Sequence, residues 1–374
     1  MRARLAELRA AGEPVELADL ENPAPDDELN AATYLTRSRR DLIALAAELH
    51  KLGRSDPLEL LEDEQVLQRV KDAFDAHRHA LADLDRALSC DIYHVKLGPA
   101  STPSVLTQTA RDRASGTRSA SRVLRWRAFL KIAEDNHDGA LADCLGLLRL
   151  GRLNDAEPAT TSHLVSVAIR GMGLQLAGQV LQSGAVSAEM HTQLEDQLAQ
   201  YDEISAYQQT LKEERVVGLM FISSGSPNSW LTRLILQRQI GAYLELIDLQ
   251  IGAISRPYSE APVTPPNAPS MVASVAPALN ATHEATVRMI ASTRCLRILN
   301  ALQKQNLTVV PAELQQAGLN LPDEVLEDPY DGGAISCRRS EAGWLIYSVG
   351  RNLVDDGGKI DQYEDVGVGP NDAQ

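Results

Sequence analysis

The sequence predicts a mainly α-helical protein with a small C-terminal α+β module that contains a β-hairpin. Alanine and leucine are abundant, while aromatic residues make up only 4% of the chain, a composition that favours packed helices over a β-rich fold. Apolar residues recur at helical spacing through most of residues 1–256. After Asp328 the pattern changes to dense turn residues followed by two short strand-like runs. Together these observations predict the fold class.

The predicted helical body covers residues 1–256. Pairs of helices with short links resemble an α-solenoid or a tetratricopeptide-like stack, although no regular 34-residue repeat is present. Gly171, Gly173 and Gly178 fall inside one helix, where glycine costs stability, so we expect a neighbouring helix to approach closely there. The predicted helices are 1–11, 28–52, 56–89 with an interruption near 62–64, 124–133, 139–150, 158–183, 187–201, 204–221 and 230–255.

A proline-rich stretch, residues 257–281, divides the chain. It holds six prolines among small polar residues, and proline at this density disfavours both helices and central strands. We therefore predict a linker or an extended strap at 257–281. The C-terminal module then covers residues 282–374.

The C-terminal module is predicted to begin with a long helix, 282–305, and to continue into a β-hairpin. The strands are Ala334–Arg339 and Trp344–Val349, separated by a short loop that ends in Gly343. Both faces of the second strand are fairly apolar, and an isolated hairpin is marginal in water. The hairpin is therefore expected to pack on the preceding helix.

The tail that follows the hairpin is acidic and rich in glycine. Residues 321–374 contain twelve Asp and Glu but four Lys and Arg, and the whole chain has a net charge of −15. Carboxylates interleaved with glycine can wrap a hard cation such as Ca²⁺. The spacing differs from the twelve-residue helix-loop-helix calcium loop, and a solvated acidic tail is the alternative. The candidate ligands are Asp355, Asp356, Asp361 and Asp365.

Two short motifs carry a family resemblance. Asp328–Tyr330 gives D-P-Y before the hairpin, and Tyr347–Gly350 gives Y-S-x-G within it. Over residues 282–361 this order resembles the C-terminal half of the major pseudopilin of type II secretion, a pilin-like helix with a β-hairpin. The resemblance implies a calcium ion held near Asp355–Gly358. Two departures are present: Asn352-Leu353 stands where that family has Asp-Gly, and the N-terminal apolar pilin helix is absent from this sequence.

The organisation of the whole chain is similar to that of a class of bacterial helical proteins anchored in a membrane upstream of an L-R-A-x-G-E-P segment. Residues 8–14 match that segment. The resemblance implies an extracytoplasmic, cell-envelope location and brings no activity with it. The sequence itself has no run of eighteen apolar residues and no signal peptide, so a membrane contact is expected only through an upstream anchor. If Met1 is the true start, the protein is expected to be cytoplasmic.

Composition limits the functional classes. A pI near 5.0 argues against nucleic-acid binding, which needs clustered Lys and Arg. No C-x-x-C pair is present, so a zinc ribbon or a thioredoxin motif is excluded, and free buried thiols are expected. No nucleophile or H-E-x-x-H motif is present either. We therefore predict a non-enzymatic interaction or scaffold protein with a protein partner.

Three places could still carry chemistry. His94 and Lys96 lie in a non-helical insert, 91–103, and inserts of this kind often line a groove, although an ordinary connecting loop is the simpler interpretation. His163 and Glu214 are further candidates, although a packed histidine and a solvated turn are the simpler interpretations of these two. A hydrolase with its site in a helical groove near these residues is one alternative function, and a pseudopilin-like secretion component is another. Two of the side chains within hydrogen-bonding reach in one pocket would support the hydrolase.

Overall fold

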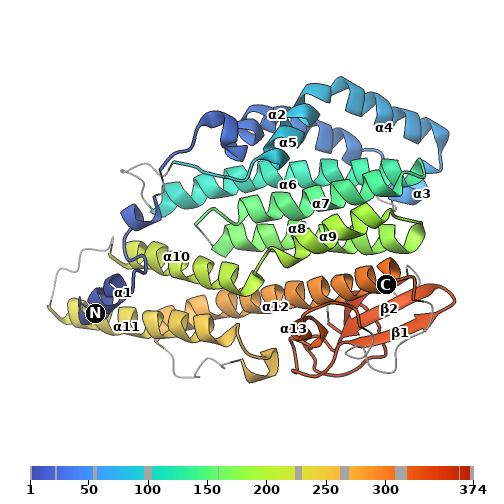
Figure 1. Cartoon of the computed structure of the whole chain (residues 1–374). Helices are drawn as coiled ribbons and strands as arrows, with labels where there is room; N and C mark the ends of the chain where they lie inside the picture. The colour runs from blue at the N-terminus through green and yellow to red at the C-terminus, as the bar shows by residue number, and fades with distance from the viewer. Residues whose placement is uncertain are drawn as a thin grey trace.

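The fold is mainly helical, with a small three-stranded antiparallel sheet at the C-terminal end, as the computed structural model shows (Figure 1). The structure describes residues 2–21, 23–53, 57–96, 103–158, 160–223, 230–261, 269–307, 318–361 and 363–370. The helices are α1 Arg2–Ala10, α2 Ala31–His50, α3 Pro57–Leu61, α4 Glu64–Ala76, α5 Arg78–Ser89, α6 Pro103–Ala133, α7 His137–Asn154, α8 Thr160–Ser183, α9 Ala188–Ala199, α10 Glu203–Ser223, α11 Trp230–Ala253, α12 Ser270–Lys304 and α13 Asp323–Leu326. The strands are β1 Ser336–Ser340, β2 Gly343–Ser348 and β3 Val366–Val368.

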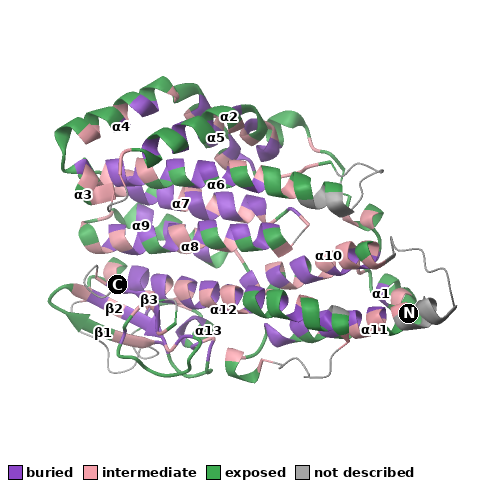
Figure 2. Ribbon diagram, turned by 180° about the vertical axis from the view of Figure 1, so that it is seen from behind, coloured by how far each residue is buried: buried purple, intermediate pink, exposed green. Residues whose placement is uncertain are grey.

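The helices lie in successive layers. In Figure 1, α2, α4 and α5 cover α6 and α7, and the layers continue through α8 and α9 to α10, α11 and α12. Buried residues concentrate in the central helices, whereas the outward faces of α4 and α5 are exposed (Figure 2). By length and hydropathy α8 could cross a membrane, but 61% of its apolar window is buried among its neighbours. The comparison with helical-repeat stacks stays a prediction.

Close helix approach is confirmed at Gly173, between α7 and α8, whereas Gly178 faces Val368 of β3 and Gly171 makes only an ordinary contact with Met289. A Cβ added at Gly173 would lie 3.0 Å from the Cβ of Leu147 and 3.3 Å from the carbonyl oxygen of Cys144. Ser166 Oγ also donates to the carbonyl of Gly151, 2.7 Å away. The glycines therefore let these two helices pack almost backbone to backbone.

Helix starts follow the side chains that can cap them. Asn30, Asp63 and Ser187 each accept a hydrogen bond from a backbone N–H in the first turn of α2, α4 and α9. The predicted interruption near 62–64 is the gap between α3 and α4. By contrast, α6 begins at Pro103, well before the predicted segment 124–133.

The prediction of a linker over 257–281 is wrong from Ser270 onward, because α12 begins there and continues through Pro277. Residues 262–268 lie outside the described part of the chain. A proline inside a helix costs about 3 kcal/mol. Val272 and Leu279 are buried in the apolar cluster beside α10 and α11, and burying such a side chain contributes about 1.5–3 kcal/mol. Burial of these side chains therefore offsets the free-energy cost of Pro277. The predicted boundary between the linker and the C-terminal module falls inside α12.

The predicted hairpin is confirmed, and a third strand extends it. β1 and β2 pair antiparallel, and β3 joins the other edge of β2. Trp344, Ile346 and Val368 are buried in the same core as the body helices and α12. The hairpin therefore packs on the preceding helix, as expected. β3 was not predicted, because a strand of only three residues shows no recognisable pattern.

Asp328 joins the two motifs that carry the pilin resemblance. Its carboxylate accepts hydrogen bonds from the backbone N–H of Tyr330 at 2.9 Å, the hydroxyl of Ser348 at 2.7 Å and the N–H of Val349 at 2.9 Å. Gly350 follows with φ +66°, and a Cβ there would lie 1.9 Å from the carbonyl oxygen of Glu364. D-P-Y and Y-S-x-G thus form one turn structure, while the relationship to pilins stays a prediction.

Candidate functional site

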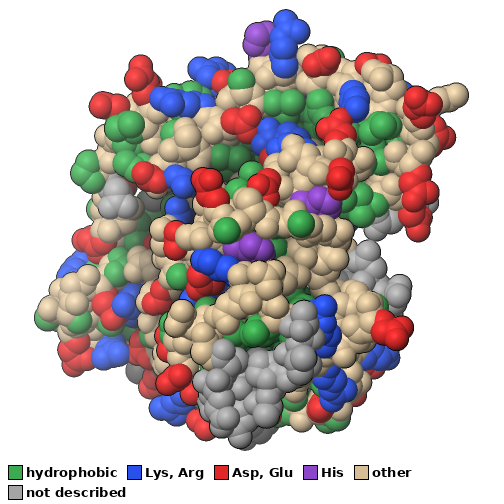
Figure 3. Space-filling view, turned by 45° about the vertical axis from the view of Figure 1, so that its right-hand side comes forward, with side chains coloured by type: hydrophobic (Ala, Val, Ile, Leu, Met, Phe, Trp, Pro, Cys, Tyr) green, Lys and Arg blue, Asp and Glu red, His purple; other side chains and the backbone are tan. Residues whose placement is uncertain are grey.

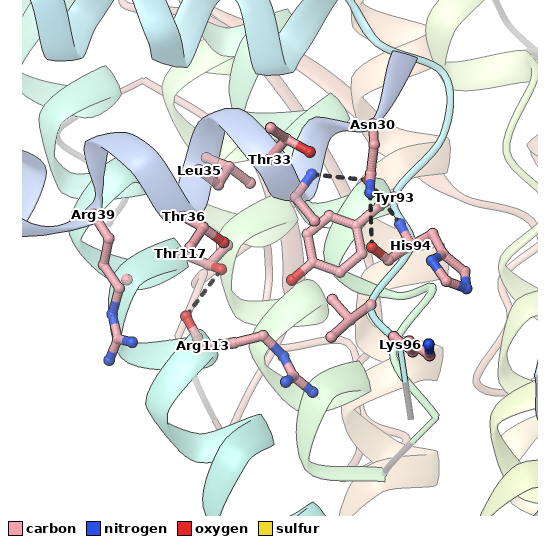
Figure 4. A pocket seen from close by; sticks show the side chains of 13 residues that line it. Asn30, Thr33, Leu35, Thr36, Arg39, Tyr93, His94, Lys96, Arg113 and Thr117 are labelled. Atoms are coloured by element: carbon pink, nitrogen blue, oxygen red, sulfur yellow. Dashed lines mark hydrogen bonds between the residues drawn. The ribbon is translucent and has the colours of Figure 1, made fainter. Parts of the chain in front are cut away.

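A pocket of about 480 Å³ opens between α2, the extended segment 92–96 and α6 (Figure 4). It is the place where the insert singled out in the sequence meets the helical body. The lining consists of small, hydroxyl-bearing and basic side chains, with no carboxylate among them: Asn30, Ala32, Thr33, Leu35, Thr36, Arg39, Tyr93, His94, Val95, Lys96, Arg113, Gly116 and Thr117. We call this cavity the α2–α6 pocket.

The side chain of Asn30 places the insert. Its Oδ1 caps α2 by accepting from the N–H of Ala32 and also accepts from the N–H of His94, 3.0 Å away. Its Nδ2 donates to the carbonyl of His94 at 2.9 Å, and the N–H of Ala31 donates to the carbonyl of Ile92 at 2.8 Å. One amide therefore holds residues 92–94 against the positive end of the α2 dipole.

Beneath the pocket, the side chains of Arg113, Glu157 and Tyr93 form a group with no net charge. Arg113 donates from Nε and Nη2 to the two carboxylate oxygens of Glu157, at 2.6 and 3.1 Å. The hydroxyl of Tyr93 donates to the same carboxylate at 2.6 Å. Glu157 is only 4% exposed, and its charge together with burial raises the pKa of Tyr93, so the phenol stays protonated. The charge of Arg113 is thus already neutralised.

Arg39 and Lys96 differ from Arg113, since neither has a hydrogen-bond or ion-pair partner among the described residues. Arg39 is partly buried, and its stem lies on α6 where Gly116 leaves room: a Cβ at Gly116 would lie 3.1 Å from Arg39 Cγ. Lys96 is exposed at the other side of the pocket. Two cations therefore border the pocket without a counter-charge.

The chemistry that this arrangement supports is anion binding. A guanidinium presents a planar set of donors that suits a carboxylate or a phosphate, and an ammonium adds a mobile charge. Thr33 and Thr36 contribute neutral hydroxyls to the lining. This basic pocket stands out because the chain carries a net charge of −15, and acidic and basic side chains are interspersed over the face in Figure 3.

Of the residues singled out in the sequence, His94 and Lys96 lie in the pocket lining, as the groove interpretation predicted. Arg39 and Arg113 were missed, because each lies inside a helix and no local pattern distinguishes it from other surface arginines. Glu214 lies elsewhere, and its carboxylate accepts from the N–H of Thr160, 3.1 Å away, and from the hydroxyl of the same residue.

His163 belongs to a buried network in the interior. Its Nδ1 lies 2.8 Å from Asp155 Oδ1, and its Nε2 lies 3.0 Å from the hydroxyl oxygen of Thr286 on α12. Tyr201 donates to the other oxygen of Asp155. Carboxylate, imidazole and hydroxyl follow the order of a catalytic triad. However, His163 is 2% and Thr286 1% exposed, and the hydroxyl donates to the carbonyl of Thr282.

An ion pair adjoins the same network. Arg170 stacks over the ring of Tyr201 at 3.9 Å and donates to Glu203, which also accepts from Thr293 at 3.1 Å. Both charged side chains are buried, and burial raises the pKa of Glu203 even beside the guanidinium. The network links α8, α10 and α12 as a structural element.

The four acids of the predicted calcium site do not share one centre. Asp355 accepts from the hydroxyl of Tyr347, from Arg338 and from the N–H of Gly357. Across the parts of the chain that the structure describes, no group of three or more His, Cys, Asp or Glu side chains is placed to hold a metal ion. The remaining acids bind their neighbours: Asp356 accepts from Asn352, Asp361 from the N–H groups of Tyr363 and Glu364, and Asp365 from those of Asp356 and Gly358. The Ca²⁺ site stays a prediction.

Comparison of the chain with protein-family models, with curated proteins and with solved structures finds no match.

Proposed function

We propose that this protein is a non-enzymatic binding protein that holds an anionic group of its ligand in the α2–α6 pocket. The observation that carries the proposal is that Arg39 and Lys96 border the cavity without a counter-charge from any residue that the structure describes, in a chain whose net charge is −15. Cations left unpaired at a concave site gain more from an incoming anion than cations that already share a carboxylate.

The polar groups of the lining support binding rather than catalysis. The hydroxyl of Tyr93 is engaged by Glu157, and that of Thr117 donates to the carbonyl of Arg113. The carboxylate beside Tyr93 is already paired with Arg113, and the partner of Thr117 is a backbone carbonyl, so neither hydroxyl is set up as a nucleophile. The scaffold role, the protein partner and the cell-envelope location expected from the sequence stay predictions, and the binding test does not depend on them.

The test uses inorganic phosphate as the probe, followed by isothermal titration calorimetry and by amide NMR shifts. We expect saturable binding with shifts centred on residues 30–39 and 92–96. Arg39→Gln should weaken it by about tenfold or more, because a hydrogen bond to a charged group contributes about 1.5–3 kcal/mol.

Arg40→Gln is the matched control. It removes the same charge from the neighbouring position of α2, where the side chain is exposed and is not part of the lining. Equal weakening by both substitutions would show a non-specific charge effect and would contradict the proposal, as would the absence of saturable binding.

A further inference from the structure

We infer that the ligand of the α2–α6 pocket is a small dianion with its two anionic groups at opposite ends, an inference that rests on the proposed function. The two unpaired cations come from different elements, Arg39 from α2 and Lys96 from the segment after α5. Figure 4 shows them at opposite sides of the pocket, with Tyr93 and Arg113 between them. Because the two cations lie on different sides of the cavity, each is placed to take its own anionic group.

The middle of the pocket is neutral. Arg113 and Tyr93 are both bonded to the buried Glu157, so this part offers no net charge to a ligand. Leu35 and Val95 add apolar surface to the lining. A matching ligand therefore carries charge at its ends and an uncharged, partly apolar stem between them.

Size and long-range charge favour a small ligand over an acidic macromolecule. A cavity of about 480 Å³ falls within the range typical of small-molecule sites. An acidic protein, a nucleic acid or an anionic membrane would be repelled by the net charge of −15 that the chain carries. A small dianion meets mainly the local field, since salt screens charges beyond about 8 Å at physiological ionic strength.

The second anionic group should strengthen binding through proximity. Once the first group is held at Arg39, the second is tethered near Lys96 and binds at a high effective concentration. The gain requires that the stem span the two cations, so affinity should depend on stem length and pass through a maximum.

The experiment titrates the full chain with an α,ω-dicarboxylate series from malonate to adipate. Each member is matched with the monocarboxylate of the same carbon number, and a parallel series of alkane diphosphonates distinguishes carboxylate from phosphate chemistry. Binding is measured by calorimetry and by NMR for the parent chain, Arg39→Gln, Lys96→Gln, the double variant and the Arg40→Gln control. Far-UV circular dichroism verifies that every variant is folded.

We expect the best-fitting dianion to bind about tenfold or more tightly than its monoanion counterpart. Arg39→Gln and Lys96→Gln should each remove that advantage, while Arg40→Gln should retain it. Equal affinities for dianion and monoanion, with both still weakened by Arg39→Gln, would overturn this inference and leave the anion-binding function standing. Affinities that Arg39→Gln leaves unchanged would overturn both.

Discussion

The buried network between α8, α10 and α12 pairs its cation with a carboxylate. The α2–α6 pocket has two cations that no described residue pairs. In the interior, Arg170 has Glu203 as its counter-charge and Tyr201 beneath its guanidinium. At the pocket, Arg39 and Lys96 have no partner among the described residues. A buried charge without a partner destabilises a fold by several kcal/mol, whereas a solvated one does not. Arg170 therefore belongs to the charges that stabilise the fold, whereas Arg39 and Lys96 remain available to bind a ligand.

The largest effect is expected where a buried ion pair loses one member. Glu203→Ala leaves Arg170 charged, only 4% exposed and without its carboxylate. The free energy of unfolding should fall by about 3–5 kcal/mol. Urea denaturation followed by circular dichroism measures the change. A decrease in the free energy of unfolding below 1 kcal/mol would show that the fold does not depend on this ion pair. The distinction between structural charges and ligand-binding charges would then fail.

A second prediction concerns Glu213, a half-buried carboxyl of α10 that has no cation partner among the described residues. Burial raises its pKa from 4.5 to about 7. The folded state therefore holds this proton more tightly than the unfolded chain does. The stabilising contribution is complete below about pH 4.5 and is lost as the pH rises to about 7. Glu213→Gln, which keeps an acceptor for Gln209, should be more stable than the parent at pH 8 by up to about 3 kcal/mol.

Denaturation of the parent and of Glu213→Gln at pH 5 and pH 8 measures this difference. The gap between the two proteins should be small at pH 5 and largest at pH 8. A gap that does not change with pH would mean that the partial burial of Glu213 does not disfavour its charged form.

A smaller effect is expected in the acidic tail. Asp365 is fully buried and accepts from the N–H groups of Gly358 at 2.7 Å and Asp356 at 3.4 Å. Asp365→Ala leaves these donors unpaired and should cost about 1–3 kcal/mol with a chelator present. Thermal denaturation of the parent and of Asp365→Ala, in EDTA and in millimolar Ca²⁺, distinguishes a structural role of Asp365 from a role in ion binding. A loss of stability that is larger in Ca²⁺ than in EDTA would support the predicted ion site. The same loss in both buffers would show that Asp365 is not one of its ligands.

The smallest effect on stability is expected at the pocket. Arg39→Gln keeps part of the stem that lies on Gly116 and removes a charge that pairs with no described side chain. The free energy of unfolding should change by about 0.5 kcal/mol or less. Urea denaturation in phosphate-free buffer provides the measurement. A loss comparable with that of Glu203→Ala would place Arg39 among the structural charges.

Local signals in the sequence were enough to predict most helices and the hairpin. Ser187 caps α9 as expected, and the loop before Gly343 joins the two strands. The errors have a common cause, which is tertiary packing. Pro277 argues for a break, yet burial of its neighbours Val272 and Leu279 keeps α12 helical. β3 is too short to show a period, and it is defined only by pairing with β2.

One side of the pocket, the insert, was recoverable from the sequence. The non-helical insert directed attention to His94 and Lys96, because a break in a helical protein is visible locally. Arg39 and Arg113 became part of the site only when α2 and α6 packed against the insert. The interior network was also only partly predictable. His163 was singled out in the sequence, but its partner Thr286 lies more than a hundred residues along the chain.

Helix α12 extends over 35 residues and contacts α8, α9 and α11 as well as β2 and β3. At 1.5 Å per residue its length is about 50 Å. The same rod therefore supplies core side chains to the helical layers and to the small sheet. Loss of the sheet would expose apolar side chains of this shared helix, so we expect both ends of the molecule to unfold in a single cooperative step.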